Sequence, residues 1–384
     1  MKVAIFMNQV VDAVYIHIPF CNYICAYCDF CKVFYNKKII NKYLEALKEE
    51  INNNYKGEII TSLYIGGGTP SSLSLDELKK LFNILKIFKI SKDCEFTFEA
   101  NPDTLTLDKI KLLKEFGVNR VSLGVETINK NLQKILERNT NKIKVINCIN
   151  NLKTSGIFNI NVDLIYAVEG ETLTLLDDDL RFILSLDIPH ISTYSLIIED
   201  NTKLKINGVK NIDKALDREM YDKICKVLKE ENYIHYEISN FSKENYQSRH
   251  NLKYWNNLQY YGFGLGAASY INNIRYSNTR SISNYINGKT VLDREILTVE
   301  DMIFYEIMLR FRTSKGIDKK IFEKKYNVKL EDLFNYKTLV KEGILENNNT
   351  YLSVNEKYFY VLDEVLTRFL YCDVKNIDKR DPMC

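Results

Sequence analysis

Four cysteines lie within eleven residues near the start of this 384-residue chain. Cys21, Cys25 and Cys28 form a C-x3-C-x2-C array, and Cys31 follows it. Three thiolates at this spacing can converge on one face of a [4Fe–4S] cube, which normally takes four cysteine ligands, so that one iron keeps an open site. We therefore expect Cys21, Cys25 and Cys28 to bind such a cluster and Cys31 to be a spare thiol.

Two other metal sites could use the same cysteines. Zinc commonly takes four thiolates in a tetrahedron, which would recruit Cys31 as the fourth ligand. Structural zinc sites usually combine two separated cysteine pairs, however, and one eleven-residue segment can hardly wrap a tetrahedron. A four-cysteine ferredoxin set is the second alternative, but its usual bacterial spacing is C-x2-C-x2-C-x3-C. The cluster with three ligands is the favoured interpretation.

Glycine and charged side chains recur where the predicted strands end. The segment Gly66-Gly67-Gly68-Thr69-Pro70 follows a strand, and its glycines let the backbone approach a ligand with exposed amides. The charged residues at later strand ends, or in the segments after them, are Glu99, Glu126, Arg138 and Asp163. Each alone could belong to a solvated rim. Together they favour a polar ligand that carries ribose hydroxyls and a carboxylate.

The elements that must position these residues alternate between strand and helix. β-branched or aromatic runs predict six strands, and segments with helical periodicity predict five helices between them. The strands are expected at 11–18, 62–65, 95–99, 120–126, 159–166 and 190–197, and the helices at 40–53, 75–88, 107–116, 143–155 and 173–185. Ser74 and Glu77 have capping-box spacing, and Gly117 and Gly156 occupy the positions after two helix ends.

Repeated βα units imply a parallel sheet. Polar residues beyond several successive strands are typical of barrels, whereas an open sheet concentrates its site at one switch point. We therefore expect an α/β fold, a partial (β/α)6 TIM-like barrel over residues 1–212. An extension is expected over 213–296 and a smaller, mainly helical C-terminal domain over 297–384.

Charge and hydropathy narrow the classes of partner. The chain has 53 basic and 50 acidic residues, a net charge of +3 that is spread evenly, so nucleic acid is not indicated as a partner. No apolar run reaches the ~18 residues of a membrane span, and the segment 1–6 is too short for the apolar part of a signal peptide. We expect a cytoplasmic protein with reduced cysteines and no integral membrane span.

One aromatic segment contains the only tryptophan, Trp255, and one of the four histidines, His250. A neutral imidazole is a common axial ligand of haem iron, and Tyr254 and Trp255 could supply flat apolar walls for a porphyrin. The alternative is the start of a surface helix. The residue types alone favour that alternative over a haem site at His250, Asn251, Tyr254 and Trp255.

The cysteine array after a first strand resembles the radical S-adenosylmethionine (radical SAM) superfamily. In that family S-adenosylmethionine chelates the open iron, and an electron from the cluster cleaves it to a 5′-deoxyadenosyl radical. The resemblance implies that S-adenosylmethionine is contacted by Tyr15, Tyr27, Gly67, Gly68, Thr69, Glu99, Glu126, Arg138 and Asp163. The chain departs from its close relatives at Glu126, where they usually carry Gln, and at 167–170, where Ala-Val-Glu-Gly replaces Gly-Leu-Pro-Gly.

The motif H-N-x-x-Y-W at 250–255, with Tyr-Glu-Ile-Ser-Asn-Phe at 236–241, resembles the signature of the HemW haem chaperones. This resemblance covers nearly the whole chain. It implies haem as cargo with His250 as a possible ligand, transfer to an acceptor protein, and an electron donor such as flavodoxin or ferredoxin. The alternative is the related oxygen-independent coproporphyrinogen III oxidase, which takes hydrogen from a propionate side chain. That oxidase resembles a longer chain, has its fourth cysteine two residues after the third and lacks the H-N-x-x-Y-W motif.

Overall fold

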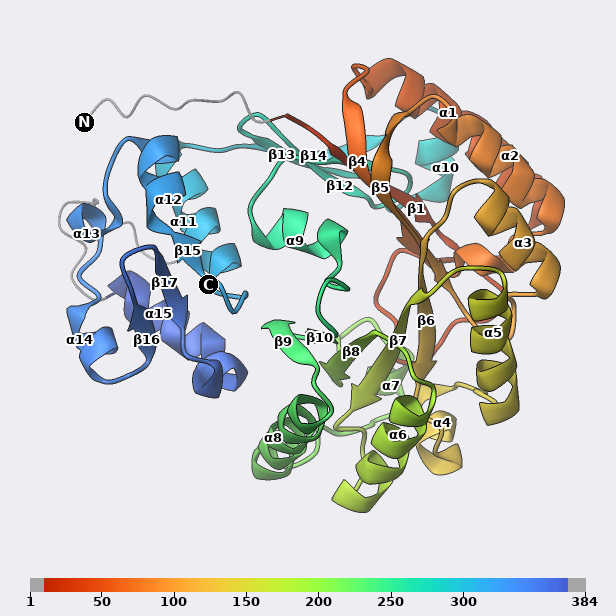
Figure 1. Ribbon diagram of the computed structural model, residues 1–384. Helices are drawn as coiled ribbons and strands as arrows, with labels where there is room; N and C mark the ends of the chain where they lie inside the picture. Colours follow the sequence, from red (N-terminus) through yellow and green to blue (C-terminus); the bar gives the residue numbers. More distant parts are fainter. Residues whose placement is uncertain (1–9, 372–384) are drawn as a thin grey trace.

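The computed structural model describes residues 10–371, so the segment 1–6, Cys372 and Cys384 lie outside the described residues. Its centre is a curved parallel sheet whose six principal strands follow the order of the sequence (Figure 1). These strands are β1 (Ala13–Ile18), β4 (Ile59–Gly67), β5 (Lys89–Ala100), β6 (Arg120–Glu126), β7 (Asn159–Tyr166) and β8 (His190–Ser195). They are the six strands predicted from the sequence, and the α/β fold with a partial barrel is confirmed.

Three short strands from the extension enlarge this sheet to nine. Strand β11 (Tyr261–Phe263) pairs in parallel with β1, while β10 (Asn240–Ser242) pairs antiparallel with β8 and β9 (Ile234–Glu237) follows at the edge. The six predicted strands form the parallel core, and these three additional strands at its edges were not predicted. These strands have three or four residues each. Such short runs carry no alternating pattern and depend on partners that are distant in the sequence.

Helices cover the outer side of the curved sheet (Figure 1). They are α1 (Lys37–Asn54), α2 (Leu75–Leu85), α3 (Leu107–Glu115), α4 (Lys130–Leu136), α5 (Lys142–Thr154), α6 (Leu173–Ser185) and α8 (Lys214–Glu230). The capping box of Ser74 and Glu77 is present. Gly117 and Gly156 follow two helix ends with φ of +88° and +78°, in the left-handed region where glycine carries little penalty. Helix α4 was not predicted from the sequence.

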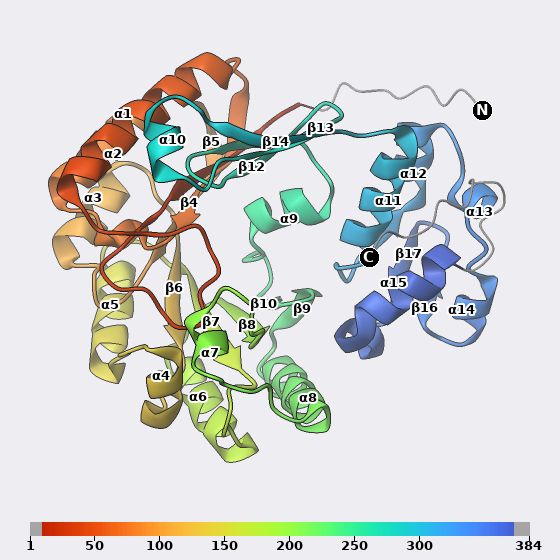
Figure 2. The same ribbon diagram turned by 180° about the vertical axis from the view of Figure 1, so that it is seen from behind.

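The open, inner side of the sheet faces helix α9 (Arg249–Trp255), which stands between the sheet and the C-terminal domain (Figures 1 and 2). The rest of the extension forms a separate sheet of β12 (Ala268–Ile271), β13 (Ile274–Asn278) and β14 (Val291–Ile296), with α10 (Ile282–Ile286) beside it. The extension thus contributes both to the main sheet and to the element that faces its inner side.

The C-terminal domain is mainly helical, as predicted. Its helices are α11 (Val299–Arg310), α12 (Lys319–Tyr326), α13 (Leu330–Leu333), α14 (Lys337–Lys341) and α15 (Leu362–Tyr371), and its small sheet has β15 (Ile317–Asp318), β17 (Tyr351–Val354) and β16 (Leu345–Asn347). Buried Glu306 accepts hydrogen bonds from Lys325 and from Asn257, which follows α9. This domain therefore supports the end of α9.

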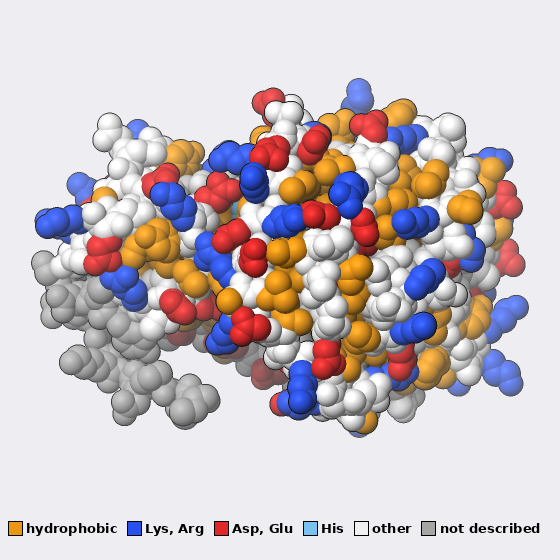
Figure 3. Space-filling view, turned by 90° about the horizontal axis from the view of Figure 1, so that it is seen from below, with side chains coloured by type: hydrophobic (Ala, Val, Ile, Leu, Met, Phe, Trp, Pro, Cys, Tyr) orange, Lys and Arg blue, Asp and Glu red, His pale blue; other side chains and the backbone are white. Residues whose placement is uncertain are grey.

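The surface mixes both signs of charge. Figure 3 shows lysine and arginine side chains interspersed with aspartate and glutamate across one face of the molecule. Among the described residues, no helix combines the length and the apolar character that crossing a bilayer requires.

Candidate functional site

The cysteine loop begins where β1 ends and is closed at its base by a two-stranded pairing. Strand β2 (Phe20–Cys21) pairs in parallel with β3 (Val33–Phe34). The Val33 amide donates to the Pro19 carbonyl at 2.7 Å, and the Tyr35 amide donates to the Cys21 carbonyl at 2.9 Å. The segment between the two strands is consequently held as a loop beyond the end of the main sheet.

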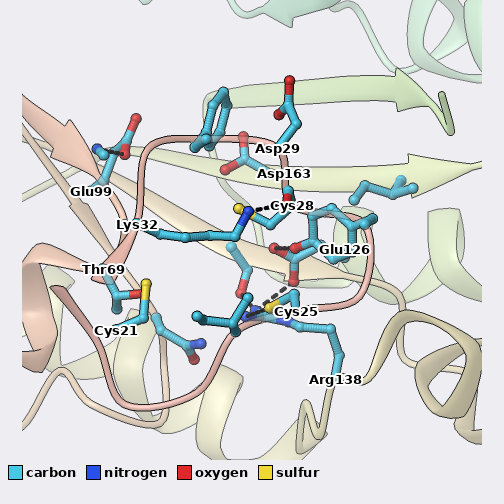
Figure 4. A pocket seen from close by; sticks show the side chains of 18 of the residues that line it. Cys21, Cys25, Cys28, Asp29, Lys32, Thr69, Glu99, Glu126, Arg138 and Asp163 are labelled. Atoms are coloured by element: carbon cyan, nitrogen blue, oxygen red, sulfur yellow. Dashed lines mark hydrogen bonds and ion pairs between the residues drawn. The ribbon is translucent and has the colours of Figure 1, made fainter. Parts of the chain in front are cut away.

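A cavity of about 460 Å³ lies at the carboxyl ends of the parallel strands and beside this loop (Figure 4). Cys21, Cys25 and Cys28 all line it. So do eight of the nine predicted cofactor contacts, namely Tyr27, Gly67, Gly68, Thr69, Glu99, Glu126, Arg138 and Asp163. The cavity has the volume of a typical small-molecule site. The cysteine array and the predicted cofactor contacts therefore meet at one place in the fold.

Tyr15 is the predicted contact that does not line this cavity. Its hydroxyl donates to Nδ1 of His17 at 3.0 Å, and Nε2 of His17 donates to the Cys31 carbonyl at 2.7 Å. Tyr15 and His17 are two residues apart on β1, so their side chains leave the same face of the strand. Through this pair the strand holds the end of the cysteine loop.

Two of the three cavity-lining cysteines have a polar side chain next to the sulfur atom. The Thr69 hydroxyl lies 3.5 Å from Sγ of Cys21, and Nη1 of Arg138 lies 3.6 Å from Sγ of Cys25 (Figure 4). Burial raises the pKa of the Cys21 thiol to about 11. Burial also raises the pKa of Cys25, while the positive charge of Arg138 opposes that rise. Three soft sulfur donors that line one cavity are the type of ligand that an iron–sulfur cluster takes.

Cys31 lies apart from the other three cysteines and does not line the cavity. A Cβ atom placed on Gly266 would be 2.8 Å from Cβ of Cys31, so the extension packs closely against it. Nη2 of Arg280, also in the extension, donates to the Asp29 carbonyl at 2.8 Å. The far side of the cysteine loop is thus held by the extension, which is a contact that sequence patterns did not reveal.

The three consecutive glycines permit three different close approaches. A Cβ atom on Gly66 would lie 2.8 Å from the Glu99 carboxylate, one on Gly67 would lie 2.9 Å from the His17 ring, and one on Gly68 would lie 2.8 Å from Sγ of Cys21. The Gly67 amide donates to Glu99 and the Gly68 amide to the Ile18 carbonyl, each at 2.9 Å. Both amides are thus bonded within the protein, and the absence of side chains at the three glycines lets the strand end pack against the cysteine loop. Contact of Gly67 and Gly68 with a cofactor stays a prediction.

Two carboxylates of the cavity, those of Glu99 and Asp163, are half-buried and hydrogen-bonded. Glu99 accepts from the Tyr64 hydroxyl at 2.7 Å, and burial raises its pKa to about 7. Asp163 accepts from Asn161 at 2.8 Å, and burial raises its pKa also. Both side chains can accept hydrogen bonds from a polar ligand when they are ionised.

Several further lining residues were missed by the sequence analysis. They include Asn101, directly after β5, and the segment Tyr194–Ile197 at the end of β8 and just beyond it. Lys32 also lines the cavity, and its ammonium donates to the Cys28 carbonyl. The sequence analysis considered selected polar residues at the ends of the first five strands. Extended to every residue that ends or follows each of the six strands, the same reasoning predicts Asn101 and residues 194–197 as site residues.

The residues predicted to bind haem lie together on α9 but outside this cavity. His250 is 1% exposed, and its two ring nitrogens share hydrogen bonds with the Ser62 hydroxyl at 2.7 Å and the Tyr254 hydroxyl at 2.8 Å. Burial lowers the pKa of His250 to about 3, so the ring is neutral. Asn251 lines a second, smaller cavity. The role of His250 as a haem ligand stays a prediction, and it requires one of these hydrogen bonds to open.

Comparisons with known proteins agree with this geometry. Residues 15–183 match the Radical SAM superfamily, and residues 297–357 match the HemN C-terminal domain. The haem chaperone HemW of Lactococcus lactis is 36% identical over 96% of this chain and 100% of its own length, and that of Bacillus subtilis is 38% identical over 93% and 98%. The chain belongs to the HemW family. Escherichia coli HemW is 28% identical over 93% of the chain and 98% of its own.

The HemW-family chain shares its fold with a solved enzyme. Coproporphyrinogen III oxidase (HemN) from Escherichia coli superposes with a TM-score of 0.83 at 20% identity, covering 95% of this chain and 91% of the oxidase. At this identity the likeness concerns the fold. It confirms the radical SAM type of partial barrel and the smaller C-terminal domain.

The turn after β7 of this HemW-family chain contains a strained residue. Ala167 has a φ of +64°, in the left-handed region that favours glycine. A non-glycine residue there costs about 1–3 kcal/mol unless the surroundings hold it. Nearby, the Glu171 carboxylate accepts from the Val168 amide at 3.0 Å, which fixes the turn after β7.

Proposed function

We propose that this protein is a haem chaperone that binds haem and transfers it to an acceptor protein. The observation that carries the proposal is the match to proteins named haem chaperone HemW along their full length. The H-N-x-x-Y-W motif on α9 supports it. A location in the cytoplasm, where thiols stay reduced, suits the nine cysteines of the chain.

The proposal includes a [4Fe–4S] cluster on Cys21, Cys25 and Cys28, with S-adenosylmethionine beside it. Such a cluster supplies an iron that binds the cofactor and an electron that can cleave it. The chain's own residues would position the cofactor. Glu99 and Asp163 offer acceptors to its hydroxyl and amino groups, and Arg138, which is paired with Glu126, adds a cation to the lining of the cavity (Figure 4). The electron donor in this proposal is a flavodoxin or a ferredoxin.

The proposal assigns haem to α9. His250 is neutral and therefore has a nitrogen lone pair for iron once the hydrogen bond to Tyr254 opens. Tyr254 and Trp255 are half-buried, so their rings already form part of the inner side of the molecule. Tyr64 would connect a haem site at this place with the larger cavity. Its ring centroid is 5.0 Å from that of His250, and its hydroxyl donates to Glu99.

The decisive experiment uses one anaerobic preparation reconstituted with iron and sulfide. Haem is titrated while its absorption spectrum is recorded, transfer to apo-haem proteins is followed, and turnover of coproporphyrinogen III is assayed. Saturable binding of about one haem per chain with transfer and without turnover is expected. Turnover to the divinyl product would instead establish the alternative, an oxygen-independent coproporphyrinogen III oxidase.

The haem ligand is tested separately with His250→Ala. The expected result is a weaker haem affinity and a changed spectrum. His235→Ala is the matched control, because His235 is also buried but packs on Phe241, away from α9. Unchanged haem affinity and spectrum in His250→Ala would refute the ligand assignment.

A further inference from the structure

A second cavity of about 50 Å³ lies on the inner side of the main sheet, next to the larger cavity. Its wall is formed by residues of β4 to β8 and by Asn251 of α9, and all of these residues are polar or charged. Glu99, Ser122, Asp163 and Tyr194 line both cavities. The two cavities are therefore separated by the same carboxylates that the proposed cofactor would contact.

The guanidinium of Arg120 belongs to the wall of this second cavity. Arg120 lies on β6 and is 2% exposed, and its Nε atom has no hydrogen-bond partner among the described residues. A buried donor without a partner costs about 1–3 kcal/mol, and more when it is charged. Buried polar cavities usually hold water that makes the missing hydrogen bonds. A cavity of this volume has room for roughly three to five water molecules.

We propose that this cavity holds a cluster of ordered water molecules that links Arg120 to Glu99 and Asp163. Arg120 is then a positioning residue for the cofactor pocket, because these waters tie its guanidinium to both carboxylates and its charge favours their ionised form. The inference rests on the proposed function of the larger cavity.

The electrostatic argument concerns the two carboxyl groups. Burial raises the pKa of Glu99 to about 7 and raises that of Asp163, and the positive charge of Arg120 opposes both rises. Without that charge, the pKa of both carboxyls would rise further. The other titratable groups that face this region from neighbouring strands and α9 are Tyr15, Tyr64, Glu126, His190, Tyr194, His250 and Tyr254.

These other groups do not replace the charge of Arg120. Burial holds the pKa of each tyrosine above its ordinary value and the pKa of His190 and His250 below theirs, so all are neutral near pH 7. Glu126 cannot supply a positive charge, and its carboxylate is paired with Arg138 at 2.5 Å. Arg120 is therefore the positive charge that opposes protonation of Glu99 and Asp163, in addition to the hydrogen bonds that Glu99 accepts from Tyr64 and Gly67 and that Asp163 accepts from Asn161.

The test measures the affinity of reconstituted full-length protein for S-adenosylmethionine between pH 6 and pH 9. Arg120→Met should weaken binding about tenfold at pH 7 for each unit by which the carboxyl pKa rises. The loss should shrink toward pH 9 as the carboxyls ionise. Arg120→Lys, which keeps the charge, should stay close to the wild type. Arg312→Met, in the ion pair with the mostly exposed Asp363, is the control.

Equal weakening at every pH, or no weakening, would overturn the inference. If Arg120→Met does not fold, a crystal structure of the wild-type chain decides: ordered water bonded to Arg120 and to both carboxylates supports the inference, and an empty cavity or a direct ion pair overturns it. A wild type that fails to bind S-adenosylmethionine would refute the proposed cofactor pocket instead. The crystal structure would still decide the water cluster in that case.

Discussion

Arg138 and Glu126 form an ion pair of 2.5 Å between side chains that are only 6% and 8% exposed. The same guanidinium reaches Sγ of Cys25 and donates to the Gly124 carbonyl at 2.7 Å. Tyr27 donates to Glu126 at 3.0 Å from the cysteine loop. The buried carboxylate of Glu126 is therefore compensated by a paired positive charge.

Removing one partner of this ion pair should be costly. Arg138→Met leaves a buried carboxylate uncompensated and should lower the free energy of unfolding of the apo-protein by about 3–5 kcal/mol. Glu126→Gln should cost less, about 1–2 kcal/mol, because the amide oxygen still accepts from Tyr27. Urea denaturation measures both. Lys203→Met breaks the exposed pair with Glu137 and should cost at most about 1 kcal/mol; an equal loss in Arg138→Met would contradict the buried-pair argument.

A methyl group on Gly68 should prevent cluster assembly. It would lie 2.8 Å from Sγ of Cys21 and 2.7 Å from the Pro19 carbonyl, so the cysteine must move. Gly68→Ala is expected to lose most of the iron and sulfide that the reconstituted wild type retains. Gly170→Ala is the control, because nothing lies within 4 Å of its added Cβ, although its φ of +78° makes alanine strained by about 1 kcal/mol. Normal iron content in Gly68→Ala would show that the loop can shift at no cost to the cluster.

The four neighbouring cysteines should divide into two groups. Serine at position 21, 25 or 28 removes a thiolate that lines the larger cavity and should abolish the cluster. Cys31→Ser should keep it, because Cys31 is turned toward Gly266. Iron and sulfide analysis, with the electron paramagnetic resonance spectrum of the reduced protein, distinguishes the groups. Loss of the cluster in Cys31→Ser would revive a four-cysteine site.

Glu171 should make the stability of the protein depend on pH. It is 2% exposed, and burial raises its pKa to about 8. The folded state then binds a proton between the unfolded pKa of about 4.3 and the folded value, so this group's contribution to stability is present at low pH and is lost as pH rises through that window. Glu171→Gln removes the titration. Its stability relative to the wild type should rise by up to about 1.4 kcal/mol per pH unit between those values and level off above pH 8.

Denaturation at pH 5, 6.5, 8 and 9 checks this slope. Glu169→Gln is the control, since Glu169 lies two residues earlier and is partly exposed. A constant difference between Glu171→Gln and the wild type at all four pH values would contradict a raised pKa for the buried carboxyl.

The sequence predicted best those elements whose limits are set locally. The bounds of β6, β7 and α6 agree with the predicted ones, because capping residues and glycines mark where these elements start and stop. Strands β9, β10 and β11 were not predicted. Their pairing is set by distant strands, as in the register of Val14 with Tyr261, and no local pattern contains that information.

The candidate site was predictable to a similar degree and for a similar reason. Carboxyl ends of parallel strands meet at one edge, so strand-end residues converge whatever the sheet curvature, and eight of nine predicted contacts line the cavity. The position of the Tyr15 side chain could not be predicted, because its hydroxyl contacts His17, which donates in turn to the Cys31 carbonyl. Arg120 sits at the start of its strand, and its approach to Glu99 depends on the curvature of the sheet.

Strand β11 is synthesised long after β1, the strand with which it pairs. The two strands are separated by roughly 250 residues, so β1 leaves the ribosome roughly 12–50 s before its edge partner. During that interval the strand that leads into the cysteine loop has a bare edge, which is a template for wrong pairing. Gly266 and Arg280, which hold the loop from outside, emerge later still. The proposed cluster would therefore find its loop fully supported only after residue 280 has been synthesised.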